Sequence, residues 1–351
     1  MRVVILLAKK RPPDLETQIA NGEAPRAEYL ELARRLEAQI VDFDSVETSR
    51  IFLVRALGRF LGLKWGLALL GAIRRKEFDC IYATGEDVGI PLAMFFRALF
   101  ATGKLMVVIH NAATAKRRSI LRFLGSGPFR YAIVLCEEQA RVLTQEIGFP
   151  ASKVKVLRQW IDHRYYRPSS GDRGDYALSV GQESRDYPTL QAVAKQLPSC
   201  RFRVVASGWS PDAGYSDARG IAEGSNISVE RNVSFARLRE LYDNCRLAIV
   251  PLQKVQYAAG VTGIVEAMSM ARGVIVSASP GIMDYTLEGK SGRVVRVGDA
   301  DAMCAAVRGL WDDATVLTEM GTHNRSWVER EINTDVYVEE VAKLLLSDPR
   351  A

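Results

Sequence analysis

The chain has 351 residues, of which 48% are hydrophobic and 25% are charged. This composition excludes a disordered or fibrous protein, and the length favours two domains, because single cores rarely grow past about 250–300 residues. The net charge of +6 suits an anionic partner such as a nucleotide-sugar or a phospholipid surface without selecting one. The five cysteines lack the spacing of a metal or redox site, which indicates buried thiols in a reducing compartment.

The first ten residues predict a buried strand rather than a signal peptide, because their apolar run is short and no small-residue cleavage pattern follows. No apolar stretch is uninterrupted over the length of a transmembrane helix. The nearest candidate, Ile51–Ile73, contains Arg55, Arg59 and Lys64. We therefore expect a cytoplasmic protein.

Short β-branched runs alternate with helix-length segments along the whole chain. Helices are expected at 26–38 and 137–147, for example. This alternation predicts parallel sheets with helices on both faces, and two such sets predict two Rossmann-like domains. The predicted strands lie near 2–8, 39–43, 79–83, 105–110, 131–135 and 154–157, and then near 177–180, 202–206, 227–230, 246–250, 273–277 and 293–297.

A linker separates the two sets. After the strand that ends at Leu157, Pro, Gly and Ser accumulate and the apolar periodicity stops, so we expect a hinge near residues 158–170. Ligands of open α/β sheets bind at the carboxyl ends of the strands. We therefore expect a binding site at the carboxyl ends of the predicted strands.

The segment 257–277 carries the most informative motif. A loop of small residues reaches Gly260, a helix is expected from about Val261, and a buried strand follows Gly273. A helix amino terminus offers free N–H groups and a positive dipole end, which suit a diphosphate. Gly260 would let a phosphate approach, Thr262 would cap the helix or donate its hydroxyl, and Glu266 would accept hydrogen bonds from ribose hydroxyls. A glycine turn before a helix with a solvated Glu explains the same spacing.

This segment resembles the donor-site signature of retaining GT-B glycosyltransferases of family four (glycosyl transferases group 1), in which a Glu is followed by seven residues and a second Glu. Glu266-Ala267-Met268 matches the second half of that signature. The resemblance covers residues 150–315 and is weaker before them. It includes Pro251, the turns at 280–285 and 292–299, and the linker pattern Ile161-Asp162 followed by Tyr166-Arg167-Pro168.

The resemblance implies an α/β GT-B architecture, with two Rossmann-like doubly wound parallel-sheet domains facing a central cleft. It implies an acceptor domain at 1–160, a donor domain at 161–332 and a terminal segment, 333–351, whose helix returns to the N-terminal domain. One position departs from the family. Ala258 stands where the first Glu, which contacts the donor sugar, is expected. The identity of the sugar therefore stays open.

Other candidate residues lie at the ends of predicted strands. In the loop that begins with Gly181, the family usually carries an Arg and a Lys that hold the diphosphate. Gln182 replaces the Arg, which leaves Arg185 as the candidate cation that stabilises the leaving group. His110 resembles a histidine that borders the reaction centre, although a histidine at a strand end is nearly as often only packed. Weaker nucleotide-binding candidates are Gly208 and Asn232.

Basic clusters lie in the N-terminal half, beside the apolar segments Ile51–Ile73 and Ile120–Phe129. Such a combination can rest on the anionic inner face of a membrane, or it can be a solvated surface around a buried helix. Aromatic residues are not interleaved with these cations as nucleic-acid binding requires. The basic clusters are Lys9–Arg11, Arg74–Lys76 and Lys116–Arg118 with Arg122.

No His or carboxylate pair has metal-ligand spacing, so no metal site and no cofactor are predicted.

The combined prediction is a retaining, metal-independent glycosyltransferase. It would move a sugar from a nucleoside-diphosphate sugar, with UDP favoured, to the hydroxyl of a lipid-linked or small-molecule acceptor. Two alternatives remain. A sugar-nucleotide epimerase of the same fold would need acid/base carboxylates in the cleft. A catalytically silent sugar-nucleotide-binding protein is compatible with Ala258.

Overall fold

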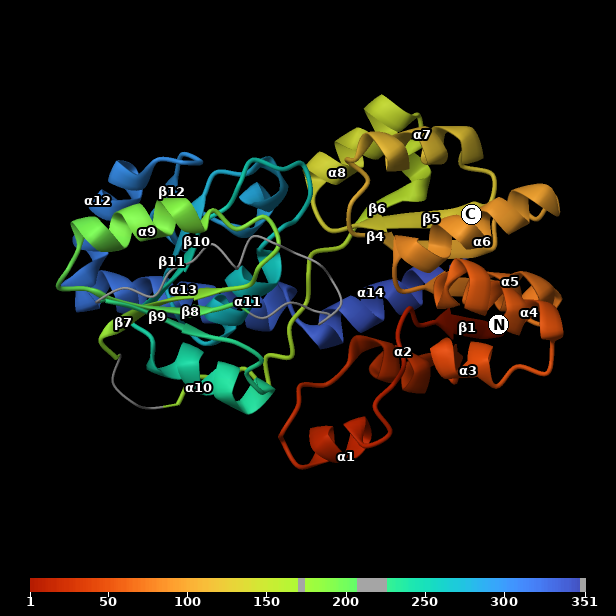
Figure 1. Cartoon of the computed structure of the whole chain (residues 1–351), viewed down its shortest axis with the longest axis horizontal. Coiled ribbons are helices and arrows are strands. Elements are labelled where there is room, and N and C mark those ends of the chain that lie inside the picture. The colour runs from red at the N-terminus through yellow and green to blue at the C-terminus, as the bar shows by residue number, and fades with distance from the viewer. Residues whose placement is uncertain (170–173, 207–225, 348–351) are drawn as a thin grey trace. The chain divides into compact units, whose positions relative to one another are not determined.

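The computed structural model describes residues 1–169, 174–206 and 226–347, and its elements are labelled in Figure 1. The chain forms two compact units. Unit 1 comprises Met1–Thr17, Arg26–Arg158 and Asp335–Ala351, and unit 2 comprises Gln18–Pro25 and Gln159–Thr334. Each unit contains one six-stranded sheet in which every pairing is parallel. The twelve predicted strands are confirmed, with shifts of a few residues at their ends.

The sheet of unit 1 has the order β2-β1-β3-β4-β5-β6. Side chains of a strand alternate between the two faces, and both faces are covered here. On β3, Ile81 and Ala83 join the apolar core beneath the helices, whereas Tyr82 points to the opposite face. The strands are β1 Val3–Leu6, β2 Gln39–Val41, β3 Cys80–Ala83, β4 Leu105–Ile109, β5 Phe129–Val134 and β6 Val154–Val156.

Helices cover both faces of this sheet. On one face α5 packs against α6 and α6 against α7, and Gly89 of α6 lies so close to β4 that a Cβ there would meet Val107 at 2.3 Å. On the other face the hydroxyls of Tyr82 and Tyr337 of α14 are 2.9 Å apart. The helices of unit 1 are α2 Glu28–Leu36, α3 Phe43–Glu47, α4 Phe52–Leu61, α5 Leu63–Ile73, α6 Glu86–Ala98, α7 Ala115–Leu124, α8 Glu137–Arg141 with a π-helical continuation Val142–Ile147, and α14 Thr334–Leu346, whose first residue lies in unit 2.

The long apolar segment Ile51–Ile73 forms two helices, α4 and α5, rather than one. Gly62 separates them with a φ of 97°, a left-handed conformation that glycine adopts without strain. Residues of α5 such as Leu67 and Leu70 are buried, whereas most of α4 is exposed. Within the described ranges, no helix combines the length and the hydropathy that crossing a membrane requires.

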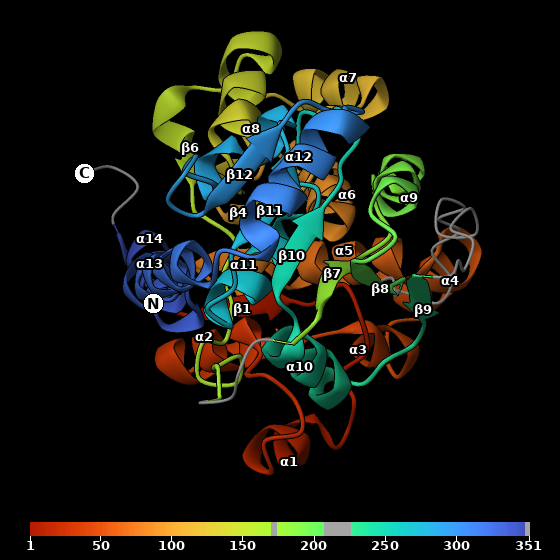
Figure 2. The same cartoon turned by 90° about the vertical axis from the view of Figure 1, so that its left-hand side faces the viewer.

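The sheet of unit 2 has the order β12-β11-β10-β7-β8-β9. In Figures 1 and 2, α9 and α10 lie on opposite faces of it. Helix α9 packs against α12, and α11 packs against α13. The strands are β7 Tyr176–Val180, β8 Arg201–Val205, β9 Ile227–Glu230, β10 Leu247–Val250, β11 Val274–Ser277 and β12 Gly292–Val295. The helices are α9 Tyr187–Gln196, α10 Phe235–Asn244, α11 Val261–Ser269, α12 Ala300–Trp311 and α13 Ala314–Glu331. Helix α1, Leu15–Ala20, spans the boundary between the units.

The segment predicted to be a linker, near residues 158–170, belongs to unit 2 from Gln159 onwards. Ile161, Tyr165 and Tyr166 are buried. The backbone carbonyl of Tyr166 accepts a hydrogen bond from Ser269 Oγ at 2.6 Å, and the carbonyl of Ile161 accepts one from the Thr334 N–H at 3.1 Å. The aromatic residues of this segment are spaced irregularly, so they show no helix or strand period in the sequence. Tertiary contacts, and not a regular element, keep them buried.

Candidate functional site

Two loops lie side by side at the carboxyl edge of the unit 2 sheet. One follows β7 and contains residues 181–186, and the other follows β10 and contains residues 251–260. The Asp186 N–H donates to the Pro251 carbonyl at 3.0 Å, and the Gln253 N–H donates to the Ser184 carbonyl at 2.9 Å. Arg185 and Leu252 also form an isolated antiparallel bridge. The two loops therefore act as one structural element.

Residues at the end of β11 and just after it fix the second loop in place. Ser277 Oγ accepts the Leu252 N–H at 3.0 Å, and Ser279 Oγ both accepts the Val255 N–H at 3.1 Å and donates to the Val255 carbonyl at 3.0 Å. Gly281 touches the same loop, since a Cβ there would lie 1.9 Å from the Tyr257 carbonyl oxygen. Sequence reasoning missed the two serines; a Ser-x-Ser pair directly after a buried strand was the available signal.

Helix α11 begins where the second loop ends. Gly260 is its N-cap, with φ 81°, and no side chain caps the helix. Thr262 is exposed and does not cap it, contrary to one of its two expected roles, because the cap position belongs to a glycine two residues earlier. Among the described residues, nothing accepts the backbone N–H groups of Thr262 and Gly263. Free N–H groups and the helix dipole make this terminus favourable for an anion.

The Arg185 side chain is 5% exposed and lies beneath this terminus. Nε and Nη2 donate to the Val180 carbonyl at 3.0 and 2.6 Å, and Nη1 donates to the Glu183 carbonyl at 3.0 Å. Burial is the main influence on its pKa and lowers it. Within the described part of the chain, no carboxylate forms an ion pair with it. A buried guanidinium whose N–H groups are bonded to neutral carbonyls keeps its charge and retains attraction for an anion.

Glycines make room for this guanidinium. A Cβ on Gly181, where φ is 110°, would lie 2.3 Å from Nη2, and one on Gly260 would lie 3.0 Å from Nη1. Gly263 is further away, at 3.7 Å from Nη2. Gly260 was predicted from the approach of a phosphate, and Gly181 as the first residue of the loop that holds it. In the structure both glycines lie next to Arg185. A larger residue at either position would therefore collide with the guanidinium, whether or not a nucleotide is bound.

Glu266 lies one turn along α11 from Thr262, and its side chain faces the interior. It is 7% exposed, and its Oε2 accepts the Tyr242 hydroxyl at 3.0 Å. Burial raises the pKa of this carboxyl to about 7, while the Tyr242 hydroxyl, the Tyr166 phenol and the Arg185 charge act in the opposite direction. Both tyrosines are themselves buried. A carboxyl with this pKa changes its charge near neutral pH.

The remaining unit 2 candidates are less closely associated with this cluster. Val261 is buried in the first turn of α11, and Ala258 is buried in the preceding loop. Asn232 is exposed, with φ 55°, after β9. Gly208 lies outside the described residues.

His110 belongs to unit 1, at the end of β4. Its ring is exposed, with Nε2 3.3 Å from the Thr84 carbonyl oxygen. The backbone N–H groups of His110 and Asn111 donate to the buried carboxylate of Glu86, at 2.9 and 3.2 Å, and Arg117 pairs with that carboxylate at 3.4 Å. Sequence reasoning missed Glu86. Its position as first residue of α6, directly after Gly85, was the available signal.

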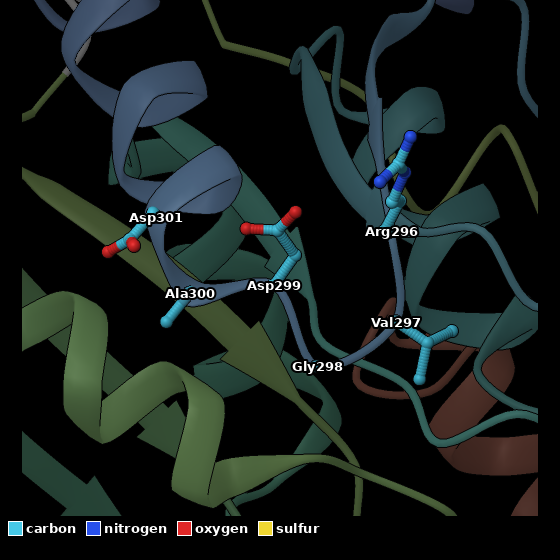
Figure 3. A pocket seen from close by; sticks show the side chains of 6 residues that line it. All are labelled: Arg296, Val297, Gly298, Asp299, Ala300 and Asp301. Atoms are coloured by element: carbon cyan, nitrogen blue, oxygen red, sulfur yellow. The ribbon is translucent and has the colours of Figure 1, made fainter.

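No group of three His, Cys, Asp or Glu side chains in the described ranges has the geometry of a metal site. A surface hollow lies at the start of α12 and is shown in Figure 3. Asp299 caps that helix by accepting the Ala302 N–H at 2.8 Å, so the helix start is already satisfied. None of the predicted donor-site residues lines this hollow, whose lining residues are Arg296, Val297, Gly298, Asp299, Ala300 and Asp301.

Comparison with known proteins places this geometry in context. Residues 187–313 match the family described as glycosyl transferases group 1. The whole chain resembles HepE of Anabaena, solved with UDP and glucose, at 15% identity and a TM-score of 0.71, covering 99% of this chain and 100% of that one. Sucrose-phosphate synthase from Thermosynechococcus elongatus gives 13% identity and a TM-score of 0.72, with 98% of each chain covered. No curated protein sequence matches significantly.

A glycosyltransferase from Rickettsia africae is similar at 12% identity and a TM-score of 0.69, with 99% of each chain covered. At such identities, similarity over the full length establishes the fold. The protein therefore has the GT-B fold, as expected from the sequence, and its residues 187–313 are similar to the group 1 glycosyl transferases.

Proposed function

We propose that the protein is a retaining glycosyltransferase that uses a nucleoside-diphosphate sugar bound to unit 2. The observation that carries the proposal is the position of Arg185 beneath the start of α11, as a buried guanidinium that forms no ion pair with a carboxylate of the described residues. Glu266, one turn further along the helix, adds a hydrogen-bond acceptor. The cation and the free N–H groups suit an anionic diphosphate, and the carboxylate one turn further along the helix suits the hydroxyls of the ribose that follows it.

Each group has a defined part in the proposed reaction. The N–H groups of Thr262 and Gly263 bind the diphosphate, and Glu266 accepts hydrogen bonds from the ribose hydroxyls. The acceptor oxygen attacks the anomeric carbon from the face that the nucleotide leaves. The glycosidic electrons depart with the nucleoside diphosphate, whose phosphate oxygen takes the acceptor proton. Arg185 and the helix terminus stabilise the charge that develops on the leaving group.

Three parts of the proposal rest on family resemblance and on the solved relatives. The retaining outcome without a metal ion follows the resemblance of Glu266-Ala267-Met268 to the family signature. UDP is the favoured nucleotide, since HepE was solved with UDP and with UDP-glucose. The acceptor, a hydroxyl on a lipid-linked or small molecule, would bind unit 1, where His110 is the candidate that borders the reaction.

The enzyme is proposed to work in the cytoplasm, with contact to an anionic membrane where its acceptor is lipid-linked. The match to group 1 glycosyl transferases favours transfer over epimerisation. Silent binding is the second candidate function, because Ala258 is buried where the family has a sugar-contacting Glu. Turnover separates these two functions, and binding alone does not.

The test combines binding with turnover. UDP, GDP and ADP are compared by their effect on the unfolding temperature, because a ligand that binds only the folded state stabilises it by mass action. Release of UDP from UDP-sugars is then measured for wild type and for Glu266→Gln. We expect the largest stabilisation from UDP and slow UDP release by wild type. Stabilisation without release would establish the silent binder, and stabilisation by none of the nucleotides would refute a donor site.

A further inference from the structure

Helix α4 of unit 1 presents large apolar side chains to solvent. Its apolar surface consists of Phe52, Leu53, Phe60 and Leu61, which are 71%, 65%, 81% and 59% exposed. The helix lies at the outside of unit 1, next to α3 and α5 (Figures 1 and 2). Single exposed apolar residues are ordinary on a protein surface, but four on one short helix indicate an interaction surface.

Packing does not require these side chains. Helix α4 meets the rest of unit 1 through its small inner residues. A Cβ on Gly58 would lie 2.8 Å from Val46 Cγ1, and one on Gly66 of α5 would lie 3.0 Å from Gly58 Cα. Val54 completes the buried side of the helix. The glycine contact anchors α4 through its backbone, so the exposed Phe and Leu side chains contribute little to folding.

The charged side chains of α4 and of the residues that flank it are all basic. Residues 50–76 contain seven Lys and Arg and no Asp or Glu. Arg50 and Arg59 form no hydrogen bond or ion pair with any described residue, and Arg55 donates to the Ser49 carbonyl. Acidic residues do occur on the neighbouring α3, but Asp44 and Glu47 there pair with Lys10. No acidic side chain in the described part of unit 1 therefore pairs with the cations of α4.

The basic clusters that first pointed to a membrane differ from α4 in this respect. Members of each cluster are paired within unit 1: Lys10 with Glu47, Arg74 with Glu77 at 2.7 Å, and Arg118 with Glu146 at 2.6 Å. Of the segments that the sequence analysis associates with a membrane, Ile51–Ile73 contains α4, and the pairing of the basic clusters favours α4 over those clusters.

We propose that the α4 apolar surface, with Arg50, Arg55 and Arg59, is the site at which the protein docks on an anionic lipid bilayer. Phe52 and Phe60 insert among the acyl chains while the guanidinium groups contact lipid phosphates. Phe52, Ala56 and Phe60 recur every four residues, so they form one row along the helix. A second copy of the chain fits less well, because a twofold contact through this face would oppose like charges.

The proposal is tested by sedimentation with vesicles of phosphatidylcholine alone and of phosphatidylcholine mixed with phosphatidylglycerol. We expect sedimentation only with the mixed vesicles, and weaker binding as salt rises. Phe52→Ser/Phe60→Ser should weaken it at least tenfold, and each of Arg55→Gln and Arg59→Gln about fivefold. Phe235→Ser, at a phenylalanine that is 49% exposed on α10, is the matched control and should bind as wild type.

A second measurement reports insertion directly. All five native cysteines are buried, so a Phe60→Cys variant offers one exposed thiol for an environment-sensitive dye. Its emission should shift to the blue on mixed vesicles, whereas dye on Phe235→Cys should not respond. Equal binding to both vesicle types, unchanged binding of the Phe52/Phe60 variant, or a lipid-free dimer that this variant abolishes would overturn the proposal. UDP stabilisation should be unchanged in every variant, which separates this test from that of the donor site.

Discussion

The two units place buried charges of opposite sign at the carboxyl ends of their sheets. In unit 1, Glu86 begins α6 and accepts the backbone N–H groups of His110 and Asn111. In unit 2, Arg185 lies beneath the start of α11 and donates to the carbonyls of Val180 and Glu183. Both helices begin at a glycine that provides no side-chain cap.

This difference decides where an anion is attracted. The Glu86 carboxylate offsets the positive end of the α6 dipole, whereas the Arg185 guanidinium adds to that of α11. The positive start of α6 is therefore offset by a carboxylate of its own unit, whereas the start of α11 stays positive. A nucleoside diphosphate is expected at the second, and Glu86 is expected to hold the loop that carries His110.

The largest expected effect follows from removing the cation of unit 2. Arg185→Met should reduce release of UDP from UDP-sugar by about 100- to 1000-fold, with a smaller loss of affinity, because the charge matters most as the bond breaks. Arg185→Lys should recover part of the rate. Arg272→Met is the matched control, since Arg272 is also buried but pairs with Asp243. It should lower stability without changing turnover of the folded protein, and equal loss in both variants would contradict the role of Arg185.

The second effect is a dependence on pH. In the proposed site the ionised Glu266 carboxylate accepts hydrogen bonds from the ribose hydroxyls, and burial raises its pKa to about 7. UDP affinity should therefore fall as pH drops below about 7, by up to tenfold per pH unit. Calorimetric titration at several pH values measures this. The Glu266→Gln variant should lose the dependence that belongs to this carboxyl and retain only that of the nucleotide; an identical pH profile would refute the assignment.

Stability without nucleotide should vary with pH in the opposite direction. The folded state holds the Glu266 proton more tightly than the unfolded chain, where the ordinary pKa is 4.5. This contribution is therefore fully present below pH 4.5 and is lost as pH rises to about 7. Chemical denaturation of wild type and Glu266→Gln should diverge over that range, with wild type losing stability relative to the variant. Parallel curves would indicate an ordinary, solvated carboxyl.

A smaller effect is expected from the tyrosine that holds this carboxylate. Tyr242→Phe removes the hydroxyl bonded to Glu266 Oε2 at 3.0 Å while keeping the ring. A neutral hydrogen bond of this kind contributes about 0.5–1.5 kcal/mol, so UDP affinity should fall by about threefold to tenfold. The pH midpoint of binding should rise, since the lost bond favoured the ionised form. Tyr176→Phe, which removes a hydroxyl bonded to the Leu241 carbonyl, is the control.

The smallest effect on the nucleotide is expected at the position that departs from the family. Ala258→Glu should leave the affinity for bare UDP unchanged and alter which UDP-sugar is bound or hydrolysed. Competition between UDP and a panel of UDP-sugars measures both. A large change in UDP affinity in the folded variant would place Ala258 beside the nucleotide instead of the sugar.

The fold was predictable from local patterns, whereas the electrostatics of the site were not. Buried parallel strands such as Val274–Ser277 are continuous β-branched runs, and the start of α11 is marked by Gly260. The orientation of Arg185 and the contact between Glu266 and Tyr242 depend on residues far apart in the chain. Helices α4 and α5 form one apolar segment in the sequence, although α4 contains Arg55 and Arg59 and α5 only Lys64. Their packing shows which large apolar side chains of the segment are exposed and which are buried.

The most direct test compares the two buried carboxylates in one experiment. UDP is titrated calorimetrically into wild type, Glu266→Ala and Glu86→Ala, with circular dichroism to confirm that each variant is folded. A charge-assisted hydrogen bond contributes about 1.5–3 kcal/mol, so Glu266→Ala should bind UDP one to two orders of magnitude more weakly. Glu86→Ala should bind it as tightly as wild type. Unchanged affinity in Glu266→Ala, or a loss confined to Glu86→Ala, would contradict a donor site in unit 2.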